Sequence, residues 1–221
     1  MSAIRFRKIG GIVKASDGTY CVGPLPGIGG PFDSAAQFFE AWADHLKFPY
    51  SEETVRERTP PHLVDDVLES IRTFPSRIKE FANQYNFRTG PFPLFHTDLY
   101  RSNVLLATRC YVIDWEDAQV LPWEMVEFAK DLCIVPPALD GPVYQEDNMD
   151  RKWWAERENY IKLVREAETS RGLDNHLSIT LGNSAVQHLA HAIWLYQIDG
   201  RIGFYNNVFN SVLDQDTVNR S

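Results

Sequence analysis

The chain has 221 residues, of which 44% are hydrophobic, and its 22 basic and 30 acidic residues leave a formal net charge of −8. This length and composition fit one packed domain, or one large lobe with an appendage. The acidic balance argues against a nucleic-acid partner, because a nucleic-acid-binding surface needs clustered Lys and Arg to displace counterions.

The cysteines and the hydropathy pattern bear on the compartment. Cys21, Cys110 and Cys133 show no C-x-x-C spacing, so neither a disulfide framework nor a zinc site is indicated. The amino terminus lacks the long apolar core of a signal peptide, and no stretch approaches the roughly 18 apolar residues of a membrane span. We therefore expect a reducing compartment, a cytoplasmic protein and no membrane partner.

A β-hairpin is predicted near the amino terminus. Residues 4–25 read as two β-prone runs on either side of Ser16-Asp17-Gly18, and Asp-Gly between such runs is a strong hairpin signal. The Gly- and Pro-rich run at residues 23–30 lacks the lysine and the Ser or Thr of a phosphate-binding P-loop. Its prolines favour a hinge over a phosphate cradle.

A helix is predicted after this run. Ser34 is its expected N-cap, and Gln37 stands three residues later in the capping-box position. Phe38, Trp42 and Leu46 would form the buried face, and the helix should end at the following Phe-Pro pair.

The next helical pattern, at about residues 63–85, is the most regular in the chain. Its apolar residues are spaced alternately three and four apart, which makes one continuous stripe: Val64, Val67, Ile71, Phe74, Ile78, Phe81 and Tyr85. Pro75 lies inside the pattern and removes a backbone hydrogen bond at a cost of about 3 kcal/mol. We therefore expect a kink, or two abutting helices in phase, packed against the carboxy-terminal helices.

The stretch FHTDLYRSNVLLATRCYVIDW, residues 95–115, contains the residue types that phosphoryl transfer needs. Asp98 can orient and deprotonate an attacking hydroxyl, while Asn103 and Asp114 offer neutral and anionic oxygen ligands to Mg²⁺. The order H-x-D-x-x-x-x-N-x-L, a β-hairpin and then an aspartate is the catalytic-loop pattern of kinases. Asp and Asn also cap turns commonly, but turn chemistry does not explain the two apolar strands between them.

This stretch resembles the aminoglycoside phosphotransferase and choline kinase-like family, whose usual wording is HGDLHxxN followed by IDWE or IDxG. The matching residues are His96, Asp98, Leu99, Asn103, Leu105, Ile113, Asp114, Trp115 and Glu116, and the likeness is strongest over roughly residues 90–132. Thr97 replaces the usual glycine, and the connecting hairpin is somewhat shorter than in the family. The hairpin must therefore be tight.

The resemblance implies an α+β fold: a mainly helical, protein kinase-like C-terminal lobe, with a short N-terminal β-hairpin and a second hairpin that carries the catalytic and metal residues. It implies that Val22 and Gly23 enter the hinge beside the adenine, and that Leu105 and Ile113 border the nucleotide. An inward-facing Leu on a strand is equally the ordinary expectation for Leu105. His96 is expected to brace the loop.

The segment after the catalytic stretch should be mostly helical. One helix is predicted from about Trp123 to Cys133 and a second over about residues 150–170. A third follows Leu177, Leu181, Ala185, Leu189 and Ile193 and ends near Gly200. His188 and His191 share a face of that helix, but no carboxylate has metalloprotease spacing, so a packed pair is favoured over a metal site. Acidic residues near position 147 should answer a helix dipole.

The sequence lacks parts of a complete kinase. No Gly-rich phosphate loop is found, and Lys14 is a poor match to the strand lysine that grips the phosphates. Residues 1–30 are therefore interpreted as a remnant of the N-terminal lobe and residues 31–221 as the C-terminal lobe. Two functions are compatible with this. One is an ATP- and Mg²⁺-dependent phosphotransferase, acting on a small-molecule hydroxyl and weak or inactive as given. The other is a pseudokinase-like binding or regulatory module.

Overall fold

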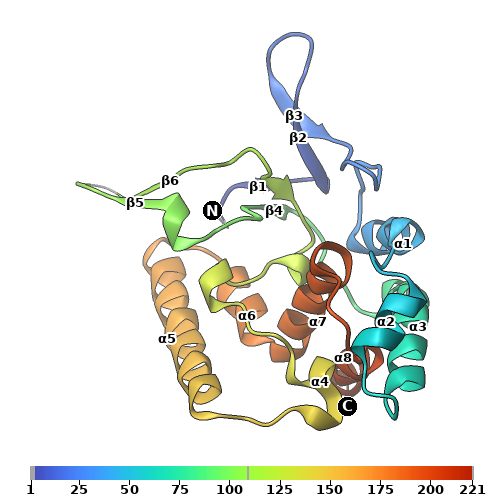
Figure 1. Cartoon of the computed structure of the whole chain (residues 1–221). Coiled ribbons are helices and arrows are strands. Elements are labelled where there is room, and N and C mark those ends of the chain that lie inside the picture. The colour runs from blue at the N-terminus through green and yellow to red at the C-terminus, as the bar shows by residue number, and fades with distance from the viewer. Residues whose placement is uncertain (1–2, 109, 221) are drawn as a thin grey trace.

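The computed structural model describes residues 3–108 and 110–220, and in them the fold is α+β, with eight α-helices and seven short strands (Figure 1). The helices are α1 (Ala35–His45), α2 (Glu52–Arg58), α3 (Val64–Gln84), α4 (Pro137–Asp140), α5 (Asn148–Ser170), α6 (His176–Gly182), α7 (Ser184–Trp194) and α8 (Tyr205–Arg220). The strands are β1 (Arg5–Phe6), β2 (Gly10–Lys14), β3 (Tyr20–Gly23), β4 (Phe92–Phe95), β5 (Val104–Leu106), β6 (Cys110–Val112) and β7 (Gln119–Val120).

Five strands form one antiparallel sheet in the order β1-β4-β7-β2-β3, and β5 and β6 form a separate hairpin. The predicted amino-terminal hairpin is confirmed as β2 and β3, with Gly18 at φ 85° in the turn, a conformation that glycine adopts without steric cost. β2 also pairs with β7, Gly10 opposite Val120. Residues before position 30 therefore share a sheet with strands from the middle of the chain.

The helix predicted over residues 63–85 is α3, and it is one continuous helix with Pro75 inside, not two abutting helices. Its stripe is buried from Val64 to Phe81, whereas Tyr85 is half-buried at the helix end. Helix α3 packs between α1 and α8. The Phe81 ring lies 5.2 Å from Phe39 of α1 and 6.3 Å from Phe209 of α8, centroid to centroid. The predicted packing against the carboxy-terminal helices is therefore confirmed.

The caps of two helices are also as predicted. The Ser34 hydroxyl accepts a hydrogen bond from the Gln37 amide, 3.3 Å, and α1 buries Phe38 and Trp42. Asp147 caps α5 in a capping box with Asp150, which satisfies backbone N–H groups that the first turn leaves free.

The helix predicted from Trp123 to Cys133 is absent. Two single 3₁₀ turns, Trp123–Met125 and Lys130–Leu132, stand in its place. The backbone groups of this segment bond to other parts of the molecule: the Val126 carbonyl accepts from Gln187 of α7, and the Lys130 amide donates to Leu99. Every side chain from 121 to 128 is buried. Tertiary packing overrides local helix propensity here.

The third predicted helix is interrupted. Asn183 separates α6 from α7, and its side chain caps α7 by accepting from the Val186 amide, 3.2 Å. A π-helical turn, Leu195–Asp199, leads to Gly200 at φ 63°. Helix α8 then follows and had no sequence prediction of its own. No helix in the described residues is long and apolar enough to cross a membrane.

Candidate active site

The loop between β4 and β5 holds Asp98 and Asn103 together. The Asn103 side-chain amide donates to the Asp98 backbone oxygen, 2.8 Å, and to its carboxylate Oδ2, 3.2 Å. Asn103 closes the 3₁₀ turn Arg101–Asn103, and its amide Nδ2 is fully used. Its Oδ1 accepts no hydrogen bond from any described residue. That oxygen and the exposed Asp98 carboxylate therefore stay available to a ligand.

His96 connects this loop to the far strand of the β5–β6 hairpin. The buried imidazole accepts from the Asp98 amide at Nδ1, 3.3 Å, and donates from Nε2 to the Ile113 carbonyl, 2.9 Å. These partners assign the neutral tautomer with its proton on Nε2. The Trp115 ring covers the imidazole edge-on, 4.9 Å between centroids. His96 thus has the bracing contacts expected from the sequence.

The register of the hairpin sets the position of Asp114. Val104 pairs with Val112, and the Ile113 amide donates to the Asn103 carbonyl, 3.0 Å. Asp114 is therefore the residue directly after the partner of Asn103. Its φ of 64° is left-handed, which is uncommon for a residue other than glycine. This conformation turns the chain sharply at the end of β6, and such backbone outliers concentrate at functional sites.

Three further hydrogen bonds fix the loop from outside. The Thr97 hydroxyl donates to the Asp117 carbonyl, 3.0 Å, so the residue that replaces the family's glycine has a structural partner. The Lys130 amide donates to the Leu99 carbonyl, 2.9 Å. The Arg101 amide donates to the carboxylate of Asp131, 2.7 Å. The backbone around Asp98 is therefore anchored at both ends.

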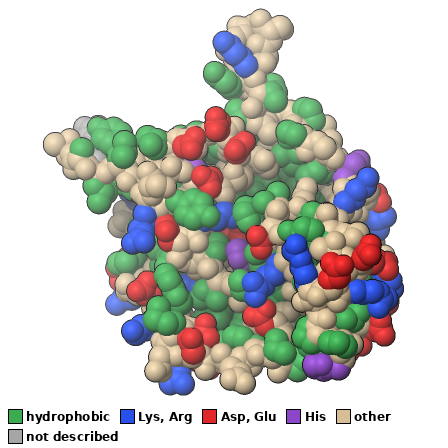
Figure 2. Space-filling view, in the orientation of Figure 1, with side chains coloured by type: hydrophobic (Ala, Val, Ile, Leu, Met, Phe, Trp, Pro, Cys, Tyr) green, Lys and Arg blue, Asp and Glu red, His purple; other side chains and the backbone are tan. Residues whose placement is uncertain are grey.

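The residues predicted to contact the nucleotide lie on two separate hairpins. Val22 and Gly23 are on β3 and pair with β2, whereas Leu105 and Ile113 belong to the β5–β6 hairpin and are 49% and 42% exposed. The two hairpins project in different directions (Figure 1). Figure 2 shows acidic side chains gathered between them and apolar side chains along the β5–β6 projection. The described residues contain no hydrogen bond from Val22 or Gly23 to that projection.

A groove of about 500 Å³ opens beside the loop. The loop contributes Leu99, Tyr100, Arg101 and Val104, and α5 contributes Trp153, Glu156 and Tyr160 on the opposite wall. Asp131 stands between the two walls. The groove is thus partly aromatic and partly acidic, and it ends next to the residue that follows Asp98.

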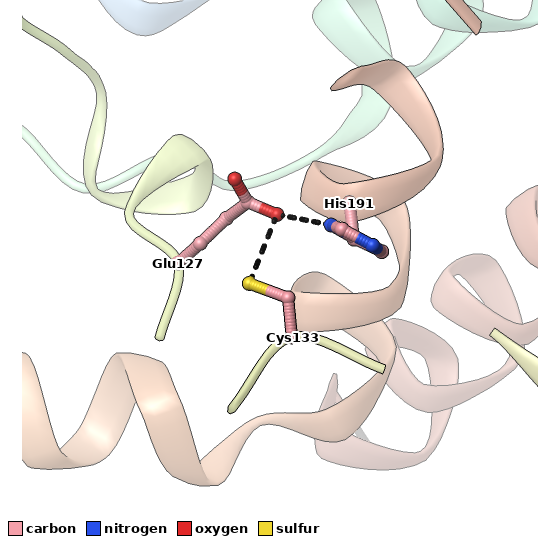
Figure 3. A group of neighbouring side chains, drawn as sticks. All are labelled: Glu127, Cys133 and His191. Carbon is pink, nitrogen blue, oxygen red and sulfur yellow. Dashed lines mark hydrogen bonds and ion pairs between the residues drawn. The ribbon is translucent and has the colours of Figure 1, made fainter. Parts of the chain in front are cut away.

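Sequence reasoning missed a second cluster, which lies below the loop (Figure 3). The buried Glu127 carboxylate accepts from Nδ1 of His191, 2.7 Å, and from the Cys133 thiol, 3.9 Å. Its other oxygen accepts from Nζ of Lys130, 2.8 Å. The three elements are far apart in sequence, and no fixed spacing indicates their meeting. The Lys130 ammonium also lies 4.2 Å from the Trp194 ring centroid.

The cluster has metal-ligating residue types, since the ligand atoms of Glu127, Cys133 and His191 lie within 4.8 Å of one another. Its charges are already matched without a metal. Burial would raise the pKa of Glu127, but His191 and Lys130 outweigh it and hold that pKa below its ordinary value. Burial and the Glu127 charge raise the pKa of Cys133 to about 12. A metal would have to displace Lys130 and deprotonate that thiol.

The wider comparisons add no family assignment. No protein-family model, curated protein or solved structure matches the chain. The argument for function therefore rests on the residues and on their geometry.

Proposed function

We propose that the chain is a protein kinase-like C-terminal lobe of the aminoglycoside phosphotransferase and choline kinase-like type, serving ATP-dependent phosphoryl transfer to a hydroxyl of a small molecule. The observation that carries the proposal is the hydrogen bond from Asn103 to Asp98, with Asp114 next to the strand partner of Asn103. Turn capping alone requires neither the hairpin register nor the left-handed Asp114.

In this proposal the loop residues divide the work. Asp98 accepts the proton of the attacking hydroxyl, while Oδ1 of Asn103 and the Asp114 carboxylate hold Mg²⁺, which prefers a few oxygen ligands and retains water. The metal would neutralise phosphate charge. His96 keeps Asp98 and the Asp114 turn in register. The groove walled by Tyr100 and Trp153 is the place for the hydroxyl substrate, because it opens next to the Asp98 loop.

The cofactor test uses Mn²⁺ as a paramagnetic substitute for Mg²⁺ in NMR titrations with and without ATP. We expect signal broadening centred on the amides of residues 98, 103 and 114, and its loss in Asp114→Asn. Asp117→Asn is the matched control, because Asp117 is also exposed and lies three residues further on. Broadening that is absent, or that Asp117→Asn removes as fully as Asp114→Asn does, would contradict the metal assignment.

The activity test compares the chain with a form that carries a complete nucleotide clamp. The sequence contains no G-x-G-x-x-G, so most of the positioning of the γ-phosphate is missing and calorimetry should show weak or undetectable MgATP binding. With an upstream lobe supplied, turnover of a panel of hydroxyl compounds should be measurable, and Asp98→Asn should abolish it while keeping the shape of the side chain.

A non-catalytic binding module is the second candidate, and one observation favours it. Leu106 is 83% exposed and Tyr111 is 52% exposed on the β5–β6 hairpin, and exposed apolar groups that gather on one projection are typical of contact surfaces. This candidate predicts no turnover even with the upstream lobe supplied. The activity test therefore separates the two functions.

A further inference from the structure

Arg157, in the middle of α5, is a buried cation without a counter-ion. The residue is only 6% exposed, and its guanidinium carbon lies 4.1 Å from the Phe128 ring centroid and 5.2 Å from that of Trp154. Within the described residues Arg157 donates no hydrogen bond and pairs with no carboxylate, and its buried Nε has no partner. Burying an unpaired charge is costly, so buried arginines normally have carboxylate partners. The aromatic faces supply only part of that compensation.

The surrounding ionisable groups leave an excess of positive charge. Glu127 is the nearby buried carboxylate, and Lys130 and His191 already bond to it. The buried cations Lys130 and Arg157 therefore share a single anion. Burial and the Arg157 charge lower the pKa of the adjacent His188 to about 4, so that imidazole is neutral at pH 7.

Arg157 lines a cavity of about 170 Å³ between α5 and the α6–α7 turn. Phe128, Trp154 and Leu181 make its apolar wall, and the exposed Glu158 contributes to its lining. Gln187, also in the lining, is 2% exposed; its amide donates to the Val126 and Thr180 carbonyls, and its Oε1 accepts nothing from the described residues. The cavity thus combines a cation that lacks an anion with an acceptor that lacks a donor.

We propose that this cavity binds a small carboxylate that also carries a hydrogen-bond donor, such as a hydroxy acid or an amino acid. The planar Arg157 guanidinium pairs with the carboxylate, a match of fork to fork. Gln187 Oε1 accepts from the hydroxyl or amino group, after a small outward shift because this atom is buried. At roughly 30 Å³ for each water-sized group, the cavity holds about six such groups. The site uses no residue of the proposed phosphotransferase centre and does not depend on that proposal.

The experiment titrates the full chain with lactate, acetate, inorganic phosphate and the neutral lactamide, followed by calorimetry and by NMR. We expect saturable lactate binding, weaker acetate binding and no lactamide binding. Arg157→Met should weaken lactate binding more than tenfold. Arg165→Met, an exposed arginine on the same helix, should leave it unchanged.

A second variant keeps the proposal testable if Arg157→Met does not fold. Gln187→Leu retains the guanidinium and removes only the acceptor, so lactate affinity should fall to that of acetate while acetate affinity is unchanged. The proposal is overturned if lactate does not saturate, if lactamide or phosphate binds as tightly as lactate, or if Arg165→Met weakens lactate as much as Arg157→Met does. Equal loss of lactate and acetate in Gln187→Leu would also overturn the assigned role of that residue.

Discussion

The ion pair between Lys130 and Glu127 should show strong energetic coupling. Their side chains are 5% and 4% exposed, and the ammonium and carboxylate are 2.8 Å apart. Replacing Lys130 by Met keeps most of the stem that packs on Trp194 but leaves the carboxylate with His191 and Cys133 only. Breaking a buried pair by removing one partner costs about 3 to 5 kcal/mol, because the other charge remains buried and uncompensated. We expect a loss in this range for Lys130→Met at pH 7.

Glu127→Gln should cost a similar amount, since it strands the Lys130 ammonium. The double variant should lose less than the sum of the two single variants, because no unpaired buried charge remains. Urea denaturation of all four proteins would give a coupling free energy of about 2 to 3 kcal/mol. The exposed pair of Lys79 and Asp44, whose side chains are 47% and 58% exposed, is the control, and its Lys79→Met and Asp44→Asn cycle should give below about 0.5 kcal/mol.

The pH dependence gives an independent check. The folded pKa of Glu127 is lowered, so the carboxylate contributes stability above its unfolded pKa of about 4.3, and this is lost as the pH falls through the folded value. Lys130→Met removes one cause of that lowering. The stability difference between wild type and variant should therefore be large at pH 7 and should shrink below about pH 4. Additive single variants, or a difference that does not depend on pH, would refute the reasoning.

Three other outcomes are expected. Phe81→Ala should cost about 3 to 5 kcal/mol in urea melts, since the ring is fully buried among other aromatic rings, whereas the exposed Glu69→Ala on the same helix should stay within about 0.5 kcal/mol. The hydrogen bond from Arg5 holds the pKa of Asp174 below its usual range, so the urea-midpoint deficit of Asp174→Asn should be present at pH 6 and vanish as the pH falls below about 4; a deficit that persists at pH 2 would contradict this. In NMR titrations the His188 imidazole should titrate near pH 4, and Arg157→Met should raise that pKa; a value at 6.5 in wild type would show that the ring is solvated.

Local periodicity and turn chemistry were enough to predict several elements. The stripe of α3, the Ser34 cap and the Asp-Gly hairpin depend on interactions between residues a few positions apart, and such interactions hold wherever the segment lies in the molecule. The catalytic stretch belongs to the same class. Asp98 and Asn103 are five positions apart, so a single turn brings them into contact.

Other features depended on the tertiary structure because their partners are distant in sequence. The backbone of residues 123–133 bonds to Gln187 and Leu99 and so does not form the helix that its composition favours. The Glu127 cluster and the cavity beside Arg157 join segments whose meeting no spacing predicts. The apolar pattern of the sequence determined which faces are buried. The position of α5 against α6 and α7 decided that Arg157 is buried without a carboxylate, because the pairing of a buried charge depends on which chain segments surround it.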